Sequence, residues 1–234
     1  MEQARHQIES LFSEISPTYD RLNHLLSFNI DRSWRRKTIA QIVFDRGESV
    51  TALDLCAGTL DLTLEFLKTF PKGIVTAVDF SQSMLDLGAK KIPPQDAGRV
   101  RLICADALKL PFPDGQFDLL FCGYGFRNLD DKEAGLNEMR RVLRPGGQLL
   151  ILEFFRPTNW FTKLFHGTYG NFILPTVGRL ISKRTGAYRY LHESISRFYS
   201  TDECSNLFYK HMFNSIKLKF LFNGVSAIIS GVKA

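Results

Sequence analysis

The stretch "LDLCAGTLDLTLEF", residues 53–66, joins an apolar strand to a helix through a sharp turn. The turn falls at Ala57, Gly58 and Thr59, and apolar residues then recur at intervals of three and four. A strand that passes directly into a helix is the building unit of parallel sheets, and such folds bind nucleotides at the turn between them. This turn holds one glycine only, so the kind of nucleotide that it accepts needs a separate argument.

The alternation of strand and helix continues along the middle of the chain. Short runs rich in Val, Leu, Ile and Phe predict strands at 50–56, 74–79, 100–104, 117–123 and 148–154. Segments with helical periodicity lie between them at 60–70, 81–91 and 131–143. Continuous apolar strands that alternate with helices are typical of a parallel sheet covered on both faces. The pattern therefore predicts a doubly wound α/β fold.

The two ends of the chain differ from this middle part. Residues 1–46 space their apolar residues as helices do, which predicts an N-terminal helical cap before a cofactor-binding core at 47–155. Residues 156–200 are dense in aromatic, basic, glycine and proline residues, and we interpret them as an inserted lid or substrate segment. Residues 201–234 are expected to supply the last strands of the same domain.

Two turn signals refine the expected sheet. The stretch "RPGGQLLILEF", residues 144–154, predicts a helix stop, a Pro-Gly-Gly turn and the entry into a strand. Asn223 and Gly224 separate two apolar runs and predict a two-residue hairpin turn. The last two strands should therefore form an antiparallel pair at the end of a mostly parallel sheet.

Composition limits the partners and the chemistry. The net charge of +6 over 234 residues favours an anionic partner such as nucleic acid, phospholipid headgroups or a phosphorylated small molecule. A mildly basic protein without such a partner is an equal alternative. The four cysteines form no Cys-x-x-Cys pair, which favours a reduced, cytoplasmic setting over a zinc site or disulfide framework. The five histidines show no metal-ligand spacing, so no metal is predicted.

Acidic residues at the ends of consecutive strands indicate which cofactor the first turn holds. A dinucleotide needs a Gly-x-Gly-x-x-Gly turn for its pyrophosphate, and here Leu60 stands in place of the second glycine. Asp79 lies 21 residues after Gly58, where an acid accepts hydrogen bonds from the ribose hydroxyls of an adenosine. Asp106 and Ala107, after the third strand, suit the adenine edge. An adenosine without a pyrophosphate points to S-adenosylmethionine, although each acid alone would be interpreted as a helix cap.

Five longer stretches of the sequence form a set: "SPTYDRLNHLLSFNIDRSWRR", "LDLCAGTLDL", "DALKLPFPDGQFDLLFCGYGFRNLDD", "EMRRVLRPGGQLLILEF" and "AYRYLHESI". Together they resemble the C-methyltransferases of menaquinone and ubiquinone biosynthesis, the UbiE/MenG family, over nearly the whole chain. The resemblance implies a class I S-adenosylmethionine-dependent methyltransferase. Its fold is Rossmann-like, with a seven-stranded, mostly parallel sheet, a terminal antiparallel hairpin, a helical N-terminal segment and an inserted lid.

The resemblance also implies which residues contact the cofactor. Gly58 should make the turn, and Asp61 resembles the family's acidic residue at the start of the following helix. The other expected contacts are Thr59, Asp79, Asp106 and Ala107.

Two of the departures from the family pattern bear on the site. Gly123 stands where the family commonly has a serine, so that contact does not transfer to this chain. Leu60 replaces a usual glycine, which leaves two alternatives. Its side chain lies near the methionine moiety and weakens cofactor binding, or it packs against the corner between strand and helix.

Three residues are expected to act on the substrate. Methyl transfer to a ring carbon needs an aligned donor, an electron-rich carbon and loss of the ring proton. Arg127, with Asn128 after the fourth strand, is too basic to take a proton but can stabilise a phenolate and orient a water. Tyr19 resembles a tyrosine that the family folds over its site, where it would polarise the quinol oxygen. The alternatives are a salt bridge from Arg127 to Asp130 or Asp131, and core packing of Tyr19.

The resemblance implies a polyprenyl quinol as substrate. Demethylmenaquinol, methylated to menaquinol, is favoured as the commoner role of short bacterial forms. The alternatives are the benzoquinol step of ubiquinone biosynthesis and a catalytically silent relative, which Leu60 and Gly123 motivate. No nucleic-acid partner is expected, because the loop after the fourth strand reads "GYGFRN" and lacks the motifs of base methylation. The oligomeric state is left open, a homodimer being one alternative.

Residues 160–184 interleave aromatic and basic side chains. This composition fits a flap that opens an apolar tunnel at an anionic membrane surface, through which a prenyl tail enters. The alternative is a lid packed on the sheet with its basic residues in water. The first interpretation predicts peripheral contact with the inner face of the membrane.

Overall fold

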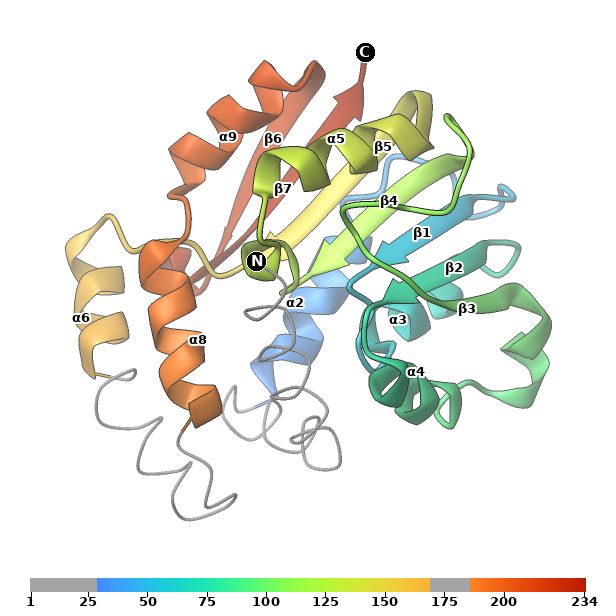
Figure 1. Ribbon diagram of the computed structural model, residues 1–234, viewed down its shortest axis with the longest axis horizontal. Coiled ribbons are helices and arrows are strands. Elements are labelled where there is room, and N and C mark those ends of the chain that lie inside the picture. The colour runs from blue at the N-terminus through green and yellow to red at the C-terminus, as the bar shows by residue number, and fades with distance from the viewer. Residues whose placement is uncertain (1–28, 169–185) are drawn as a thin grey trace.

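A seven-stranded sheet forms the centre of the protein (Figure 1). The computed structural model describes residues 29–168 and 186–234. The strand order is β3-β2-β1-β4-β5-β7-β6, in which β1 to β5 are parallel and β7 runs antiparallel to β5 and β6. The strands are β1 (Thr51–Leu55), β2 (Ile74–Asp79), β3 (Val100–Cys104), β4 (Phe117–Gly123), β5 (Leu143–Glu153), β6 (Phe213–Leu221) and β7 (Ser226–Lys233). The predicted mostly parallel sheet with a terminal antiparallel hairpin is confirmed.

Helices cover both faces of the sheet (Figure 1). They are α2 (Ile30–Ile39), α3 (Asp61–Thr69), α4 (Gln82–Ala89), α5 (Lys132–Val142), α6 (Trp160–Thr168), α8 (Gly186–Arg197) and α9 (Thr201–Lys210). Short 3-10 turns are η1 (Pro94–Arg99), η2 (Phe126–Asn128) and η4 (Phe222–Gly224). The three helices predicted for the middle of the chain correspond to α3, α4 and α5.

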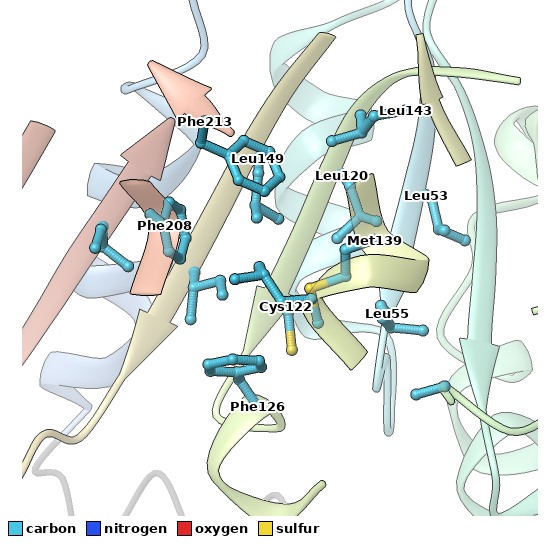
Figure 2. Close-up of a cluster of buried hydrophobic side chains, with 14 of the residues drawn as sticks. Leu53, Leu55, Leu120, Cys122, Phe126, Met139, Leu143, Leu149, Phe208 and Phe213 are labelled. Carbon is cyan, nitrogen blue, oxygen red and sulfur yellow. The ribbon is translucent and has the colours of Figure 1, made fainter. Parts of the chain in front are cut away.

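Alternate residues of each central strand enter different apolar cores, because successive side chains point to opposite faces of a sheet. In β1, Leu53 and Leu55 join the cluster that α5 and α9 complete, whereas Ala52 joins the cluster under α2, α3 and α4. Figure 2 shows Met139 of α5 and Phe208 of α9 with the first of these clusters. Burial on both faces sets the strand register, and with it the position of the loops at the carboxyl edge.

The predicted helix stop is confirmed, since α5 ends at Val142, but the Pro-Gly-Gly stretch lies inside β5 and not before it. Strand β5 begins at Leu143, which pairs with Phe117, and the pairing with β4 shifts register over the following residues, where Gly146 has φ of 74°. A Cβ atom at Gly147 would lie 2.8 Å from the carbonyl oxygen of Arg144 and 3.1 Å from that of Asp118. Close approach of three backbone segments therefore requires glycine inside this irregular part of the strand.

The connection between β6 and β7 is longer than predicted. Leu221 pairs with Ser226, so residues 222–225 form the link instead of Asn-Gly alone. Asn223 and Gly224 do adopt left-handed backbone conformations, with φ of 54° and 94°. The dipeptide thus marks the turn correctly, and the pairing of the strands sets its length.

The turn after β1 is tightly wound and places Leu60 in the core. Cys56, Gly58 and Leu60 have φ of 57°, 51° and 68°. This left-handed conformation costs a residue with a side chain about 1–2 kcal/mol. Leu60 is fully buried against α4, where a Cβ atom at Gly88 would lie 2.4 Å from its Cγ atom. The structure supports the second alternative for Leu60, in which its side chain packs at the corner between strand and helix.

We expect Gly88→Ala to destabilise the protein by about 1–3 kcal/mol, because the added methyl group overlaps the buried Leu60 side chain. Leu60→Ala alone should cost about 2–5 kcal/mol through the cavity that it leaves. In the double variant the new methyl group occupies part of that cavity, so the combined loss should be smaller than the sum. Urea unfolding of the three variants measures this coupling. Strictly additive losses would contradict the packing.

Candidate active site

A cavity opens at the carboxyl ends of β1, β2 and β4. The strand order reverses here, since β1 lies between β2 and β4, and doubly wound sheets bind their ligands at such a point. Apolar side chains of Leu55, Val78 and Met84 contribute to its lining. The residues predicted from the sequence that line it together are Gly58, Asp79, Asp106, Ala107 and Asn128.

Asp79 holds two turns of the site together. Its Oδ2 atom accepts a hydrogen bond from the backbone N–H of Gly58 at 2.8 Å, and its Oδ1 atom accepts one from Ser81 at 2.9 Å. Burial raises the pKa of Asp79, while the hydrogen bonds from backbone amides oppose the rise. A carboxylate has about four lone-pair positions, and the backbone amides of Gly58, Ser81 and Phe80 use three of them, so capacity is left for about one hydroxyl group of a ligand.

Three carboxyl groups line the same cavity, from Asp79, Asp106 and Asp130. A wall with this charge attracts a cation and disfavours phosphate groups. The sulfonium group of S-adenosylmethionine is a cation, whereas a dinucleotide brings a pyrophosphate. The charge of the cavity therefore fits S-adenosylmethionine, in agreement with the single-glycine turn.

Arg127 forms a buried ion pair with Glu153 at the end of β5. The NH1 group of Arg127 donates to Oε1 of Glu153 at 2.7 Å and to the carbonyl of Tyr124 at 2.6 Å, and its backbone N–H donates to Oε2 at 3.2 Å. Glu153 is fully buried, and burial raises its pKa while Arg127 opposes the rise. The described partner is thus Glu153, and neither Asp130 nor Asp131 pairs with this guanidinium.

Helix α8 packs against the turn that carries Arg127 and Asn128. The Tyr190 hydroxyl donates to Oδ1 of Asn128 at 3.0 Å, and Nε of Arg127 donates to the Ser194 hydroxyl at 3.3 Å. Tyr190 and Ser194 are four residues apart and lie on one face of α8. The sequence arguments did not single out these two residues or Glu153. A single acid at the end of the apolar run "LLILEF" was the signal that could have found Glu153.

Thr59 and Asp61 do not line the cavity. Thr59 is buried in the turn after β1. The Asp61 carboxylate faces Nζ of Lys91 at 2.6 Å and a guanidinium nitrogen of Arg35 at 3.3 Å, which joins α3 to α2 and to the end of α4. Tyr19 lies outside the described residues, so its expected place over the site remains a prediction.

The described residues offer no metal centre and no membrane span. Within residues 29–168 and 186–234, no group of three or more His, Cys, Asp or Glu side chains could hold a metal ion. Across the same residues, no helix has the length and apolar character needed to cross a bilayer. All four cysteines are free thiols, so none forms a disulfide.

Solved structures share this architecture. An S-adenosylmethionine-dependent methyltransferase from Thermotoga maritima superposes with a TM-score of 0.67 at 19% identity, over 96% of this chain and 99% of that one. The [4+2]-cyclase SpnF superposes with a TM-score of 0.71 at 15% identity, over 97% and 95% of the two chains. At such identities the likeness establishes the fold, which is that of the class I S-adenosylmethionine-dependent methyltransferases.

Sequence relatives identify the family. Residues 1–233 match the ubiE/COQ5 methyltransferase family. The demethylmenaquinone methyltransferase of Staphylococcus saprophyticus is 35% identical over 230 residues, which cover 98% of this chain and 97% of that protein. That of Staphylococcus aureus strain JH9 is also 35% identical, over 98% and 94% of the two chains. The chain belongs to the ubiE/COQ5 methyltransferase family, and it is an S-adenosylmethionine-dependent methyltransferase.

Replacing Arg127 by methionine should destabilise the fold by about 3–5 kcal/mol, because Glu153 is then a buried carboxylate without its cation. The double variant Arg127→Met/Glu153→Leu should lose less than the sum of the single variants. Guanidinium unfolding at neutral pH measures both quantities.

Arg156→Met is the matched control, since Arg156 pairs with Glu203 at 2.5 Å on the surface, where both side chains are about half exposed. An exposed pair is worth about 0–1 kcal/mol. If both arginine variants lost the same stability, the Arg127 pair would not have the structural role described above.

Proposed function

We propose that this protein transfers a methyl group from S-adenosylmethionine to a ring carbon of a polyprenyl quinol, with demethylmenaquinol as the substrate. The observation that carries the proposal is the acidic switch-point cavity, which gathers Gly58, Asp79, Asp106 and Asn128. The demethylmenaquinone methyltransferases at 35% identity match this chain over almost its whole length, which supports the choice of head group.

The cofactor half of the cavity centres on Asp79. When bound, S-adenosylmethionine supplies a methyl group on a cationic sulfur. The Asp79 carboxylate would accept a hydrogen bond from a ribose hydroxyl while holding the backbone of Gly58 and Ser81. Asp106 and the backbone of Ala107 would contact the adenine edge. Asp61 and Thr59, predicted as contacts, would act on the shape of the turn, because their side chains do not line the cavity.

The substrate half centres on Asn128. Its Oδ1 atom already accepts a hydrogen bond from Tyr190, which orients the side chain at the cavity wall. Arg127 does not line the cavity and its charge is paired with Glu153, so it holds this turn and thereby positions Asn128. Asn128 would hydrogen-bond to the quinol oxygen, whose negative charge after deprotonation delocalises onto the ring carbon and makes that carbon nucleophilic. We propose Asn128 as the group that contacts the quinol, Arg127 as the residue that positions it, and Tyr19 as a further group over the site.

A catalytically silent relative is the alternative function. It was motivated by Leu60 and Gly123. Leu60 packs into the core, so it does not occlude the cavity. Gly123 lines the cavity and lacks the serine hydroxyl common in the family. One of the two reasons for this alternative is thereby removed.

Purified protein with methyl-labelled S-adenosylmethionine should label a demethylated naphthoquinol kept reduced, and should label the benzoquinol counterpart more slowly. Calorimetry on the same sample measures cofactor binding separately. Binding of the cofactor without transfer to either quinol would favour the silent alternative. Faster labelling of the benzoquinol would reassign the head group.

Asp79→Asn should weaken cofactor binding about tenfold or more, because a charged acceptor of hydrogen bonds is lost. Asp45→Asn makes the same chemical change at an exposed position outside the cavity, and should bind as the wild type does. Equal binding by the two variants would remove Asp79 from the cofactor site.

Peripheral membrane contact is part of the proposal. Trp160 and Leu164 on α6 are 76% and 58% exposed, and Phe220 and Phe222 at the β6–β7 hairpin are 58% and 48% exposed. The ring of Phe161 lies 6.0 Å from Trp160 and 6.2 Å from Phe222, so the helix and the hairpin form one surface. Exposed lysines accompany it at 163, 217 and 219. Aromatic residues with lysines are typical of a surface that inserts among anionic headgroups.

The double variant Trp160→Ser/Leu164→Ser should bind anionic phospholipid vesicles several-fold more weakly than the wild type, because two exposed apolar side chains no longer insert. Cosedimentation measures the partition, which should also fall as salt rises. Tyr209→Ser on α9 removes a side chain that is 60% exposed and serves as the control. If both proteins bound vesicles as the wild type does, α6 would not be the contact. A homodimer and the absence of a nucleic-acid partner remain predictions.

A further inference from the structure

A second cavity lies between α6, α8 and the start of β7. Apolar side chains supply most of its wall, and they come from segments far apart in the chain. They include Phe154, Phe155, Phe165, Leu191, Ile195 and Val225.

Two polar side chains in this wall have hydrogen-bond partners. The Thr162 hydroxyl donates to Asn159, and Nε2 of His166 lies 3.0 Å from the Ser196 hydroxyl. The His166 and His192 rings stack with their centroids 4.2 Å apart, and burial lowers the pKa of His166. Among the described residues, those that line the cavity include no Asp, Glu, Lys or Arg. An apolar ligand is therefore the chemistry that this wall accepts.

Two contacts connect the lining of the second cavity to the active site. The Phe154 ring, which lines the second cavity, stacks on Tyr124, which lines the first, with centroids 4.7 Å apart. Helix α8 provides the other connection. Its Tyr190 bonds to Asn128 of the active site, while the neighbouring Leu191 and Ile195 line the second cavity.

The outer side of the second cavity borders the exposed aromatic surface of α6 and the hairpin. Phe165 lines the cavity and lies 5.7 Å from Phe222, which is 48% exposed. Gly224 and Val225 of the hairpin line the cavity as well. An apolar chain between these walls would thus have the active site on one side and the membrane-facing surface on the other.

We propose that this second cavity binds the isoprenoid tail of the quinol whose ring lies in the active-site cavity. The inference rests on the proposed function, since it assigns a subsite to that substrate. The first isoprene units would pack against Phe154, Leu191 and Ile195, and the remainder would continue past Phe222 toward the bilayer. Tail binding would hold the ring beside Asn128 through the shared helix α8.

The test compares two quinols that share a ring and differ in the tail. Val225→Trp places a large side chain in the cavity wall. It should raise KM for a long-tailed demethylated naphthoquinol about tenfold, since losing the burial of about two methylene groups changes binding by about that factor. KM for the tail-less quinol should change less than twofold. Leu191→Phe, in the wall formed by α8, is a second variant with the same expected pattern.

Val43→Trp is the matched control, because it makes the same substitution at a side chain that is 60% exposed and does not line the cavity. It should leave both KM values unchanged. An equal rise in KM for the two quinols in Val225→Trp, or no rise for either, would overturn the assignment.

A binding experiment separates this inference from the proposed reaction. Calorimetry should show that the wild type binds a twenty-carbon prenol without a ring, and that Val225→Trp binds it at least tenfold more weakly. If the protein bound the prenol selectively but transferred no methyl group, the apolar site would be supported and the proposed reaction would be contradicted. A straight-chain alcohol of equal length that bound as tightly would assign the cavity to a lipid acyl chain and overturn the proposal.

Discussion

The arrangement of the site depends on the buried ion pair between Arg127 and Glu153. Glu153 ends a central strand with no exposure, and removing a carboxylate from water costs several kcal/mol unless a cation and hydrogen bonds offset it. Arg127 supplies both, and its remaining contacts to Tyr124 and Ser194 connect the turn after β4 to α8. The turn beside the cofactor cavity and the helix beside the second cavity are therefore connected through one charge pair. A buried ion pair of this kind fixes the positions of the segments that it joins and adds little to the net stability of the fold.

The strands and helices of the core were predictable because their side-chain periods are regular. Ala52 alternates with Leu53 and Leu55 between two dry clusters, and few other arrangements bury all three. The turns were less predictable. The Pro-Gly-Gly stretch became part of β5 because Leu143 finds a partner in β4, and that partner is distant in the sequence. Here the pairing between strands, and not the local turn residues, determines where the strand begins.

The cofactor side of the site was predictable for a geometric reason, since parallel strands bring their carboxyl ends to one edge. Asp79 and Asp106 each follow such a strand, and both line the cavity. Glu153, Tyr190 and Ser194 were not predictable, because their roles depend on partners that lie 26 to 67 residues away. Neither spacing nor composition encodes those distances. A buried glutamate shows its function only when the guanidinium beside it is seen.

Leu60 and Gly88 restrict the order in which this sequence can evolve. A left-handed backbone suits glycine at position 60, and leucine fits there because α4 presents no side chain at position 88. In any stepwise lineage, glycine at 88 is the permissive change that must precede or accompany leucine at 60. When leucine is present at 60, a side chain introduced at 88 alone would overlap it in the core. The residue that the turn after β1 can hold at position 60 therefore depends on the residue at position 88 of α4.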